Sequence, residues 1–214
     1  MDLEESLKNL QSDYIDVYLY HRDDPTMPVE QLVEIMEEFV HEGKIRYYGC
    51  SNWSTNRIRE VDAYCKKKGY RGFVTNQALY NVGVHGMRRM IDPTMKKMDD
   101  KMIEYHKQQI ENVAMGYSSV CSGFFHKLDS NWNPNLEQSE YFSEENIRCL
   151  EELKKLMKKY RASLTQVELG FLLTRDFSCI PIYGPRNEVD LLDAVQALDI
   201  PFTVADYQFL ERVN

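Results

Sequence analysis

The stretch DYIDVYLYHRDD, residues 13–24, joins a short apolar run to a charged end. Residues 17–20 are consecutively apolar, the pattern of a strand buried on both faces, as in the parallel sheets of α/β proteins. His21 and three charged residues follow directly. In α/β sheets and barrels the carboxyl ends of the strands carry the binding and catalytic groups. His21 is therefore the first candidate for a functional residue.

The composition favours one globular domain. The 214 residues are 43% hydrophobic and 28% charged, which is enough for one sizeable core. A net charge of −8 disfavours nucleic acid or an anionic membrane as partner. The five cysteines include no C-x-x-C pair, which favours reduced thiols in the cytoplasm over a disulfide framework or a metal site. The first ten residues lack a signal-peptide pattern, and no run reaches the roughly 18 apolar residues of a membrane span.

Predicted strands and helices alternate along the chain. The strands are expected at residues 14–20, 45–52, 72–77, 112–119 and 179–184. The helices are expected at residues 28–42, 54–69, 93–110, 143–160, 163–175, 187–197 and 203–213. Residues 121–141, which are rich in Gly, Asn, Ser and Pro, are interpreted as a long functional loop.

This alternation predicts βαβ units and a parallel sheet, either a doubly wound sheet or part of a (β/α)8 barrel. No G-x-G-x-x-G turn follows any predicted strand, which disfavours a Rossmann sheet that binds a dinucleotide. A polar cluster closes every strand instead, as at the active-site rim of a barrel. The clusters are His21-Arg22-Asp23, Ser51-Asn52, Asn76-Gln77, Tyr117-Ser118 and Gly184-Pro185-Arg186.

Four segments, in this order and at these spacings, resemble the carboxyl-terminal part of the aldo-keto reductases. They are SLKNLQSDYIDVYLYHRDD (6–24), EGKIRYYGCSNW (42–53), TNQALYN (75–81) and PIYGPRNEVDLLDAVQAL (181–198). The resemblance implies an NAD(P)H-dependent (β/α)8 barrel that reduces aldehyde or ketone carbonyls. It favours a partial barrel of five parallel strands, and we expect one such domain over residues 1–214.

The resemblance also assigns roles near the reacting carbonyl. It makes His21 the histidine that orients the substrate carbonyl, a task that suits a neutral imidazole because one ring nitrogen can donate a hydrogen bond. Ser51, Asn52 and Gln77 match the residues that hold the nicotinamide carboxamide in the family. Hydroxyl and amide side chains suit this task, because they can pair with both the donor and the acceptor of the carboxamide. Tyr117 matches the aromatic residue that stacks under the nicotinamide ring.

The remaining assignments concern the phosphates and the adenosine of the cofactor. Ser118, Gly123 and Lys127 fall in the segment that covers the pyrophosphate in the family. The adenosine and its 2′-phosphate are expected at Gly184, Pro185, Arg186 and Asn187. Asp190 stands where many NADP-preferring members have an arginine, and a carboxylate there repels a phosphate. The choice between NADP(H) and NAD(H) therefore stays open, and no metal is expected.

The resemblance begins just before the family's fourth strand. The family's catalytic tyrosine, lysine and aspartate find no match in the sequence, so we expect an amino-terminally truncated domain that is inactive as an isolated chain. Two alternatives stay open: a non-catalytic dinucleotide-binding or regulatory pseudoenzyme, and a truncated gene product without activity. Five strands also leave two edges, 14–20 and 179–183, which predicts self-association or docking of an amino-terminal fragment of the same family.

Several of these residues also allow purely structural interpretations. Ser51 and Asn52 could cap the next helix, and Tyr117 could be a core residue. His106 lies in a predicted helix and is expected to face solvent, whereas His126 falls in the predicted loop and has only a weak claim to a function.

Overall fold

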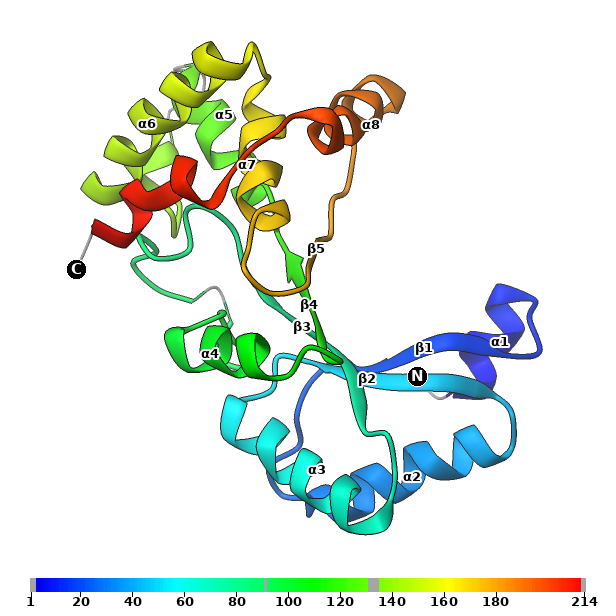
Figure 1. The fold of residues 1–214 in the computed structure, drawn as a ribbon. Helices are drawn as coiled ribbons and strands as arrows, with labels where there is room; N and C mark the ends of the chain where they lie inside the picture. Colours follow the sequence, from blue (N-terminus) through cyan, green and yellow to red (C-terminus); the bar gives the residue numbers. More distant parts are fainter. Residues whose placement is uncertain (1–2, 91, 131–134, 213–214) are drawn as a thin grey trace. The chain divides into compact units, whose positions relative to one another are not determined.

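The computed structural model of the protein describes residues 3–90, 92–130 and 135–212, which form two compact units. The first unit holds the described residues up to Gln77 together with Asp99–Val113, and the second holds Ala78–Met98 with the described residues from Ala114 onward. The strands follow the sheet order β1-β2-β3-β4-β5, and helices alternate with them (Figure 1). The predicted α/β fold of a partial (β/α)8 barrel is confirmed. Within the described ranges, no helix is both long and apolar enough to cross a membrane.

The first unit begins with strand–helix alternation close to the predicted bounds. Its elements are α1 (Leu3–Leu10), β1 (Ile15–Tyr20), α2 (Val29–His41), β2 (Ile45–Ser51), α3 (Thr55–Lys68), β3 (Phe73–Leu79) and α4 (Asp100–Gln108). The last two residues of β3 belong to the second unit. β2 pairs in parallel with both β1 and β3, α2 packs against β2, and α3 packs beside α2 (Figure 1).

Local capping explains where α3 and α4 begin and end. The Ser54 hydroxyl accepts the Arg57 N–H over 3.3 Å, and Gly69 ends α3 in the left-handed conformation with φ 78°. The Asp99 carboxylate accepts the Met102 N–H over 2.9 Å, so α4 begins at Asp100 rather than near residue 93. The capping interpretation of Ser51 and Asn52 is therefore wrong, because Ser54 fills that position.

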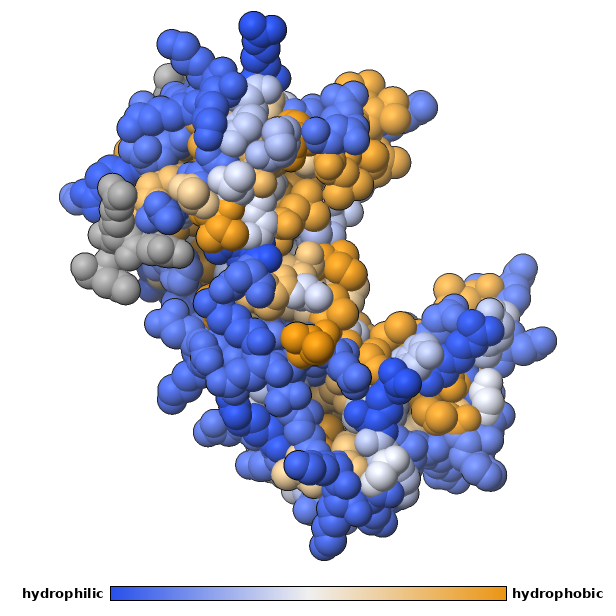
Figure 2. All heavy atoms as spheres, in the orientation of Figure 1, coloured by the Kyte–Doolittle hydropathy of each residue, from blue (hydrophilic) through white to orange (hydrophobic). Residues whose placement is uncertain are grey.

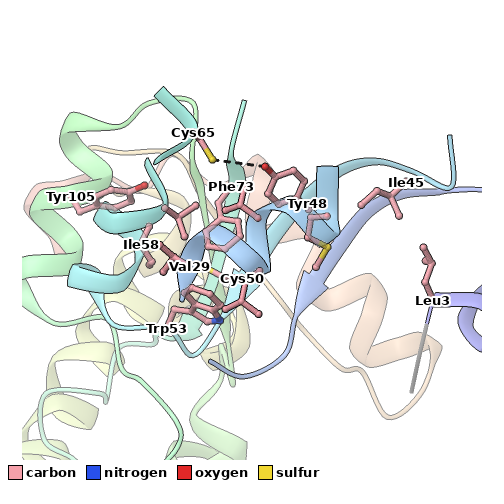
Figure 3. Packing of buried hydrophobic residues seen from close by; sticks show 14 of the residues in the cluster. Leu3, Val29, Ile45, Tyr48, Cys50, Trp53, Ile58, Cys65, Phe73 and Tyr105 are labelled. Atoms are coloured by element: carbon pink, nitrogen blue, oxygen red, sulfur yellow. Dashed lines mark hydrogen bonds between the residues drawn. The ribbon is translucent and has the colours of Figure 1, made fainter. Parts of the chain in front are cut away.

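An aromatic core fills the space between the strands and helices of the first unit (Figure 3). The rings of Trp53 and Phe73 meet edge to face with centroids 5.1 Å apart. Tyr48 is buried among them, and its hydroxyl donates to Glu37 over 2.6 Å and lies 3.9 Å from the Cys65 sulfur. This packing holds α2 and α3 on the strands that carry the candidate site.

β1 is less buried than its apolar sequence predicts. Val17 is 42% exposed, and the side chains of residues 18–20 are only partly covered. The prediction of a strand buried on both faces is wrong for this structure, because β1 is an edge strand of the described sheet with a neighbour only at β2.

The second unit contains more helix. Its elements are β4 (Val113–Tyr117, whose first residue lies in the first unit), η1 (Cys121–Gly123), α5 (Phe124–Asp129), η2 (Leu136–Gln138), α6 (Glu144–Tyr160), α7 (Leu164–Leu173), β5 (Cys179–Pro181), α8 (Glu188–Val195), η3 (Gln196–Asp199) and η4 (Val204–Arg212). β4 and β5 are parallel. Residues 164–172 of α7 are all buried, and α7 packs against α6 and β5. At Gly170 an added Cβ would lie 2.5 Å from Phe202 and from the Tyr207 hydroxyl, so only glycine fits.

The interpretation of residues 121–141 as one long loop is wrong. The segment contains a 3-10 turn, the helix α5 and a second short 3-10 turn, while residues 131–134 lie outside the described part. α5 forms because Phe124 and Phe125 pack into the core and are almost fully buried. The last predicted helix is a 3-10 helix, Val204–Arg212, and residue 213 of that prediction is not described.

Candidate functional site

His21 directly follows β1, and the segment that carries it is attached to α3. The His21 side chain is exposed, and its main-chain carbonyl accepts the Asn52 amide Nδ2 over 3.3 Å. Two residues later, Asp23 pairs with Arg57 through two N–O distances of 3.1 Å, and both side chains are mostly buried. Arg57 also donates to the Met27 carbonyl over 3.0 Å. The His21 backbone is thereby fixed from both sides.

Ser51, Asn52 and Gln77 form one hydrogen-bonded group beside His21. Ser51 and Gln77 are register partners in the parallel pair β2–β3. The Ser51 hydroxyl accepts Asn52 Nδ2 over 2.9 Å and donates to Gln77 Oε1 over 3.3 Å. The Asn52 N–H donates to the Gln77 carbonyl over 3.0 Å. Gln77 lies inside β3 rather than at its end, but the register still places it level with Ser51.

Asn52 adopts an unusual backbone conformation. Its φ of 62° places it in the left-handed region, which asparagine enters more readily than most residues. Ser51 and Asn52 are 1% and 2% exposed, whereas Gln77 is partly buried. Non-glycine residues in this conformation cluster at functional sites, where the surrounding structure holds them in place. The group combines a hydroxyl with two amides and so offers both hydrogen-bond donors and acceptors.

Asn76, next to Gln77, is not part of this group. It is fully buried, and its Nδ2 lies 3.2 Å from His106 Nε2. His106 is itself only 1% exposed, with Nδ1 3.0 Å from the Asn112 carbonyl, and burial lowers its pKa. The prediction that His106 faces solvent is wrong, because α4 turns this face onto the strands of the first unit.

In the second unit, Tyr117 and Ser118 close β4. The Tyr117 side chain is partly buried, and its carbonyl accepts the Tyr80 N–H over 3.4 Å. The Ser118 carbonyl accepts Asn81 Nδ2 over 3.0 Å. The next residue, Ser119, donates through its hydroxyl to the Ile182 carbonyl over 2.7 Å, which joins the ends of β4 and β5.

A run of left-handed residues follows β4. Ser118, Cys121, Ser122 and Gly123 have φ values of 54°, 50°, 54° and 74°. Three of the four are not glycine, so this turn stores backbone strain. Turns that combine right-handed and left-handed residues point successive N–H groups into a concavity that suits anions. Lys127 returns to this turn, where its Nζ donates to the Ser122 carbonyl over 3.3 Å.

Two titratable groups lie beside this turn: His126, which had only a weak claim to a function from the sequence, and Glu168, which was not predicted as a site residue. His126 Nε2 lies 3.1 Å from the Thr165 hydroxyl, and its Nδ1 lies 3.4 Å from a carboxylate oxygen of Glu168. Glu168 is 0% exposed, and its burial raises its pKa well above the ordinary value. Burial also lowers the pKa of His126. The available signal was an acid inside the apolar run of residues 164–173.

Residues 184–187 form the turn between β5 and α8. All four are exposed, and an added Cβ at Gly184 would meet no atom within 4 Å. The Asn187 side chain caps α8 by accepting the Asp190 N–H over 3.0 Å. The Arg186 guanidinium binds the Asp190 carboxylate through two contacts of 2.8 and 3.3 Å. Within the described residues, no three His, Cys, Asp or Glu side chains come together as metal ligands.

The sequence model of the Aldo/keto reductase family matches residues 1–214. The chain belongs to the aldo/keto reductase family. It is similar to YcsN of Bacillus subtilis strain 168, named an uncharacterized oxidoreductase, at 36% identity over 92% of this chain and 56% of that protein. It is 29% identical to the aldo-keto reductase YhdN of the same strain, over 87% of this chain and 54% of YhdN.

A solved structure confirms the likeness of the fold. The crystal structure of the thermostable aldo-keto reductase Tm1743 with the inhibitor epalrestat matches 99% of this chain and 64% of that chain, with a TM-score of 0.67 and 25% identity. The chain spans little more than half the length of the curated relatives named above.

Proposed function

We propose that this chain carries substrate-orienting and cofactor-binding residues of an NAD(P)H-dependent oxidoreductase that reduces aldehyde or ketone carbonyls. The observation that carries the proposal is the hydrogen-bonded group of buried Ser51 and Asn52 with partly buried Gln77, beside His21. The imidazole of His21 is exposed to solvent, so it can donate a hydrogen bond to the carbonyl oxygen of a substrate. The hydroxyl and amides suit a nicotinamide carboxamide, which presents one donor group and one acceptor.

The second unit, considered by itself, offers groups suited to other parts of a dinucleotide. Tyr117 presents a partly buried ring for stacking, and the turn from Ser118 to Gly123 with Lys127 combines N–H groups with a cation. Such a set fits a pyrophosphate. Gly184, Pro185, Arg186 and Asn187 would meet the adenosine. When bound, the dinucleotide supplies a hydride, while the protein supplies binding and orientation.

We further propose that residues 1–214 alone do not reduce carbonyls at a useful rate. No residue in the chain matches the family's proton-donating tyrosine or the lysine and aspartate that tune it. Loss of acid catalysis lowers a rate by about two to four orders of magnitude. A non-catalytic dinucleotide-binding protein is the second candidate function, which the same hydrogen-bonded group of Ser51, Asn52 and Gln77 supports equally.

The test is equilibrium binding of NADH and NADPH to the purified chain by calorimetry, with an aldehyde-reduction assay alongside. We expect Ser51→Ala and Gln77→Ala to weaken binding of both nucleotides by about three- to tenfold each, the cost of one hydrogen bond. Thr26→Ala, which removes an exposed hydroxyl of the same unit, is the matched control and should leave binding unchanged. Absence of binding to the unmodified chain rules out the proposal and the alternative. Steady reduction of the aldehyde rules out only the proposed inactivity.

The partner that we propose is further polypeptide. β1 and β5 are the edge strands of the described sheet, and Val17 and Ile180 on them are 42% and 50% exposed. In the second unit, apolar side chains gather over α8 (Figure 2). The apolar residues of this region that are more than half exposed are Val189, Leu192, Val195 and Leu198. These four residues, the α8 stripe, recur every third position along α8 and η3, and such a group of exposed apolar side chains is typical of an interaction surface.

A further inference from the structure

In the turn before α8, the positive charge of Arg186 is already neutralised by the carboxylate of Asp190. Arg186 and Asp190 lie one helical turn apart, and the planar guanidinium meets both carboxylate oxygens, at 2.8 and 3.3 Å. The Arg186 main-chain N–H also approaches Asp190, at 3.4 Å. Asp190 therefore receives backbone and side-chain donors from one residue. The Arg186 side chain is 86% exposed, whereas that of Asp190 is 20% exposed.

The position of Asp190 is fixed by the capping of α8. Its N–H is held by the Asn187 side chain at 3.0 Å, which places the carboxylate in the first turn of the helix. Carboxylates are stabilised there by the helix dipole. The hydrogen bond from Arg186 lowers the pKa of Asp190, so the carboxylate stays ionised at neutral pH. Glu188 adds a second negative charge to the same turn.

The charges around this turn do not suit a 2′-phosphate. Arg186 contributes one positive charge, and Asp190 and Glu188 contribute two negative charges in the same helical turn. His126, which lies close enough for Arg186 to lower its pKa, is kept neutral mainly by burial. A phosphate monoester carries a charge of about −1.5 to −2 at pH 7, so it would meet a surface with no net positive charge. A ribose 2′-hydroxyl carries no such charge and can donate to a carboxylate.

We propose that Asp190 makes this chain prefer NAD(H) over NADP(H), because its carboxylate forms an ion pair with Arg186. The inference rests on the proposed function, because it takes residues 184–187 as the adenosine end of a cofactor site. Asp190 acts here as a specificity-determining residue, since its carboxylate pairs with the Arg186 guanidinium and neutralises the positive charge that would bind a 2′-phosphate. Arg186 alone would favour the opposite preference.

The test measures four dissociation constants on the full chain by calorimetry: NADH, NADPH, AMP and adenosine 2′,5′-bisphosphate. We expect the unmodified chain to bind NADH and AMP more tightly than their 2′-phosphorylated counterparts. Asp190→Asn should tighten binding of the two 2′-phosphorylated probes by about three- to tenfold, as for one like charge removed from an exposed site, and leave AMP unchanged. The gain should shrink at 0.5 M salt because of screening.

Asp199→Asn is the matched control, because Asp199 is an exposed acid in the η3 segment that follows α8. It makes the same change in net charge and should leave all four constants unchanged. A preference of the unmodified chain for NADPH, or an unchanged ratio in Asp190→Asn, overturns the inference while the proposed function stands. Failure of all four probes to bind overturns both together.

Discussion

Nδ1 of His126 lies 3.4 Å from a carboxylate oxygen of Glu168, a residue with no exposed surface. Among the described residues, neither carboxylate oxygen accepts a hydrogen bond of good geometry. The Cys121 thiol is near enough to lower the pKa slightly, but burial dominates and raises it well above 4.5. A neutral carboxyl beside a neutral imidazole is the arrangement that burial favours for this pair.

This pair predicts a stability that falls as pH rises. Above pH 4.5 the unfolded state releases the Glu168 proton while the folded state keeps it. The free energy of unfolding therefore decreases with pH, by at most about 1.4 kcal/mol per pH unit, until the folded pKa is reached. Glu168→Gln should flatten the profile and raise stability at pH 8 by about 1–3 kcal/mol.

Urea unfolding between pH 5 and pH 9 measures this difference. His126, whose lowered pKa gives a slope of opposite sign below about pH 6.5, contacts Glu168, so the two proteins are compared above pH 7, where this ring is neutral in both the folded and the unfolded state. Glu137→Gln, an exposed acid of the same unit, is the control and should leave the profile unchanged. Parallel profiles for Glu168→Gln and the unmodified chain would contradict the prediction.

The ion pair of Asp23 and Arg57 is expected to hold the segment that carries His21. Asp23→Asn leaves the mostly buried guanidinium without its counter-charge and should cost about 1–3 kcal/mol of stability. The double variant with Arg57→Gln should lose less than the sum of the two single losses, because it removes both charges.

Asp16→Asn breaks the exposed pair with Arg46 and serves as the control, with an expected loss below about 1 kcal/mol. Denaturant midpoints of the four variants give the comparison. Equal losses of stability for Asp23→Asn and Asp16→Asn would contradict the prediction, because the burial of the Asp23–Arg57 pair would then add nothing to its contribution to stability.

Gly49 is expected to tolerate no side chain, because β2 and β3 approach closely there. An added Cβ would lie 2.5 Å from the Thr75 carbonyl oxygen and 2.7 Å from its methyl group. Gly49→Ala should destabilise the first unit by about 1–3 kcal/mol or more, since a backbone atom must move. Thermal unfolding measures the loss.

Gly43→Ala provides the contrast for Gly49→Ala. Gly43 has φ 72° but no heavy atom within 4 Å of an added Cβ, so only the conformational cost of about 1 kcal/mol applies. A Gly49→Ala loss no larger than that of Gly43→Ala would show that β2 can shift away from β3 without cost.

The exposed edges and the α8 stripe predict self-association. Sedimentation at micromolar concentration should show species heavier than the 25.3 kDa monomer. Leu192→Glu should reduce their fraction, because it places a charge inside the stripe. Ile110→Glu, which alters an exposed apolar residue outside the stripe, should change nothing. A stable monomer with protected amides in β1 and β5 would contradict the prediction.

Much of the fold could be predicted from the sequence because its signals are local. Ser54 and Gly69 mark the ends of α3 through hydrogen bonds within a few residues, and the apolar runs mark the strands. The polar residues after the strands indicated the candidate site, and the register of Ser51 with Gln77 then brought two of them together. The alternation of strands and helices left a doubly wound sheet and a partial barrel open, and the polar strand ends together with the family resemblance favoured the partial barrel.

Burial and pairing, in contrast, were decided by the tertiary structure. β1 and the interior helix α7 are both apolar in sequence, yet β1 is half exposed at an edge while α7 is covered on all sides. In the sequence, His106 and Glu168 have no feature that predicts burial, yet elements distant in the chain enclose both of them. The pairing of Asp23 with Arg57 likewise joins residues 34 positions apart, which only the tertiary structure brings together. The physical reason is that local patterns determine which hydrogen bonds a segment makes with itself, whereas exclusion of water depends on residues far away in the chain.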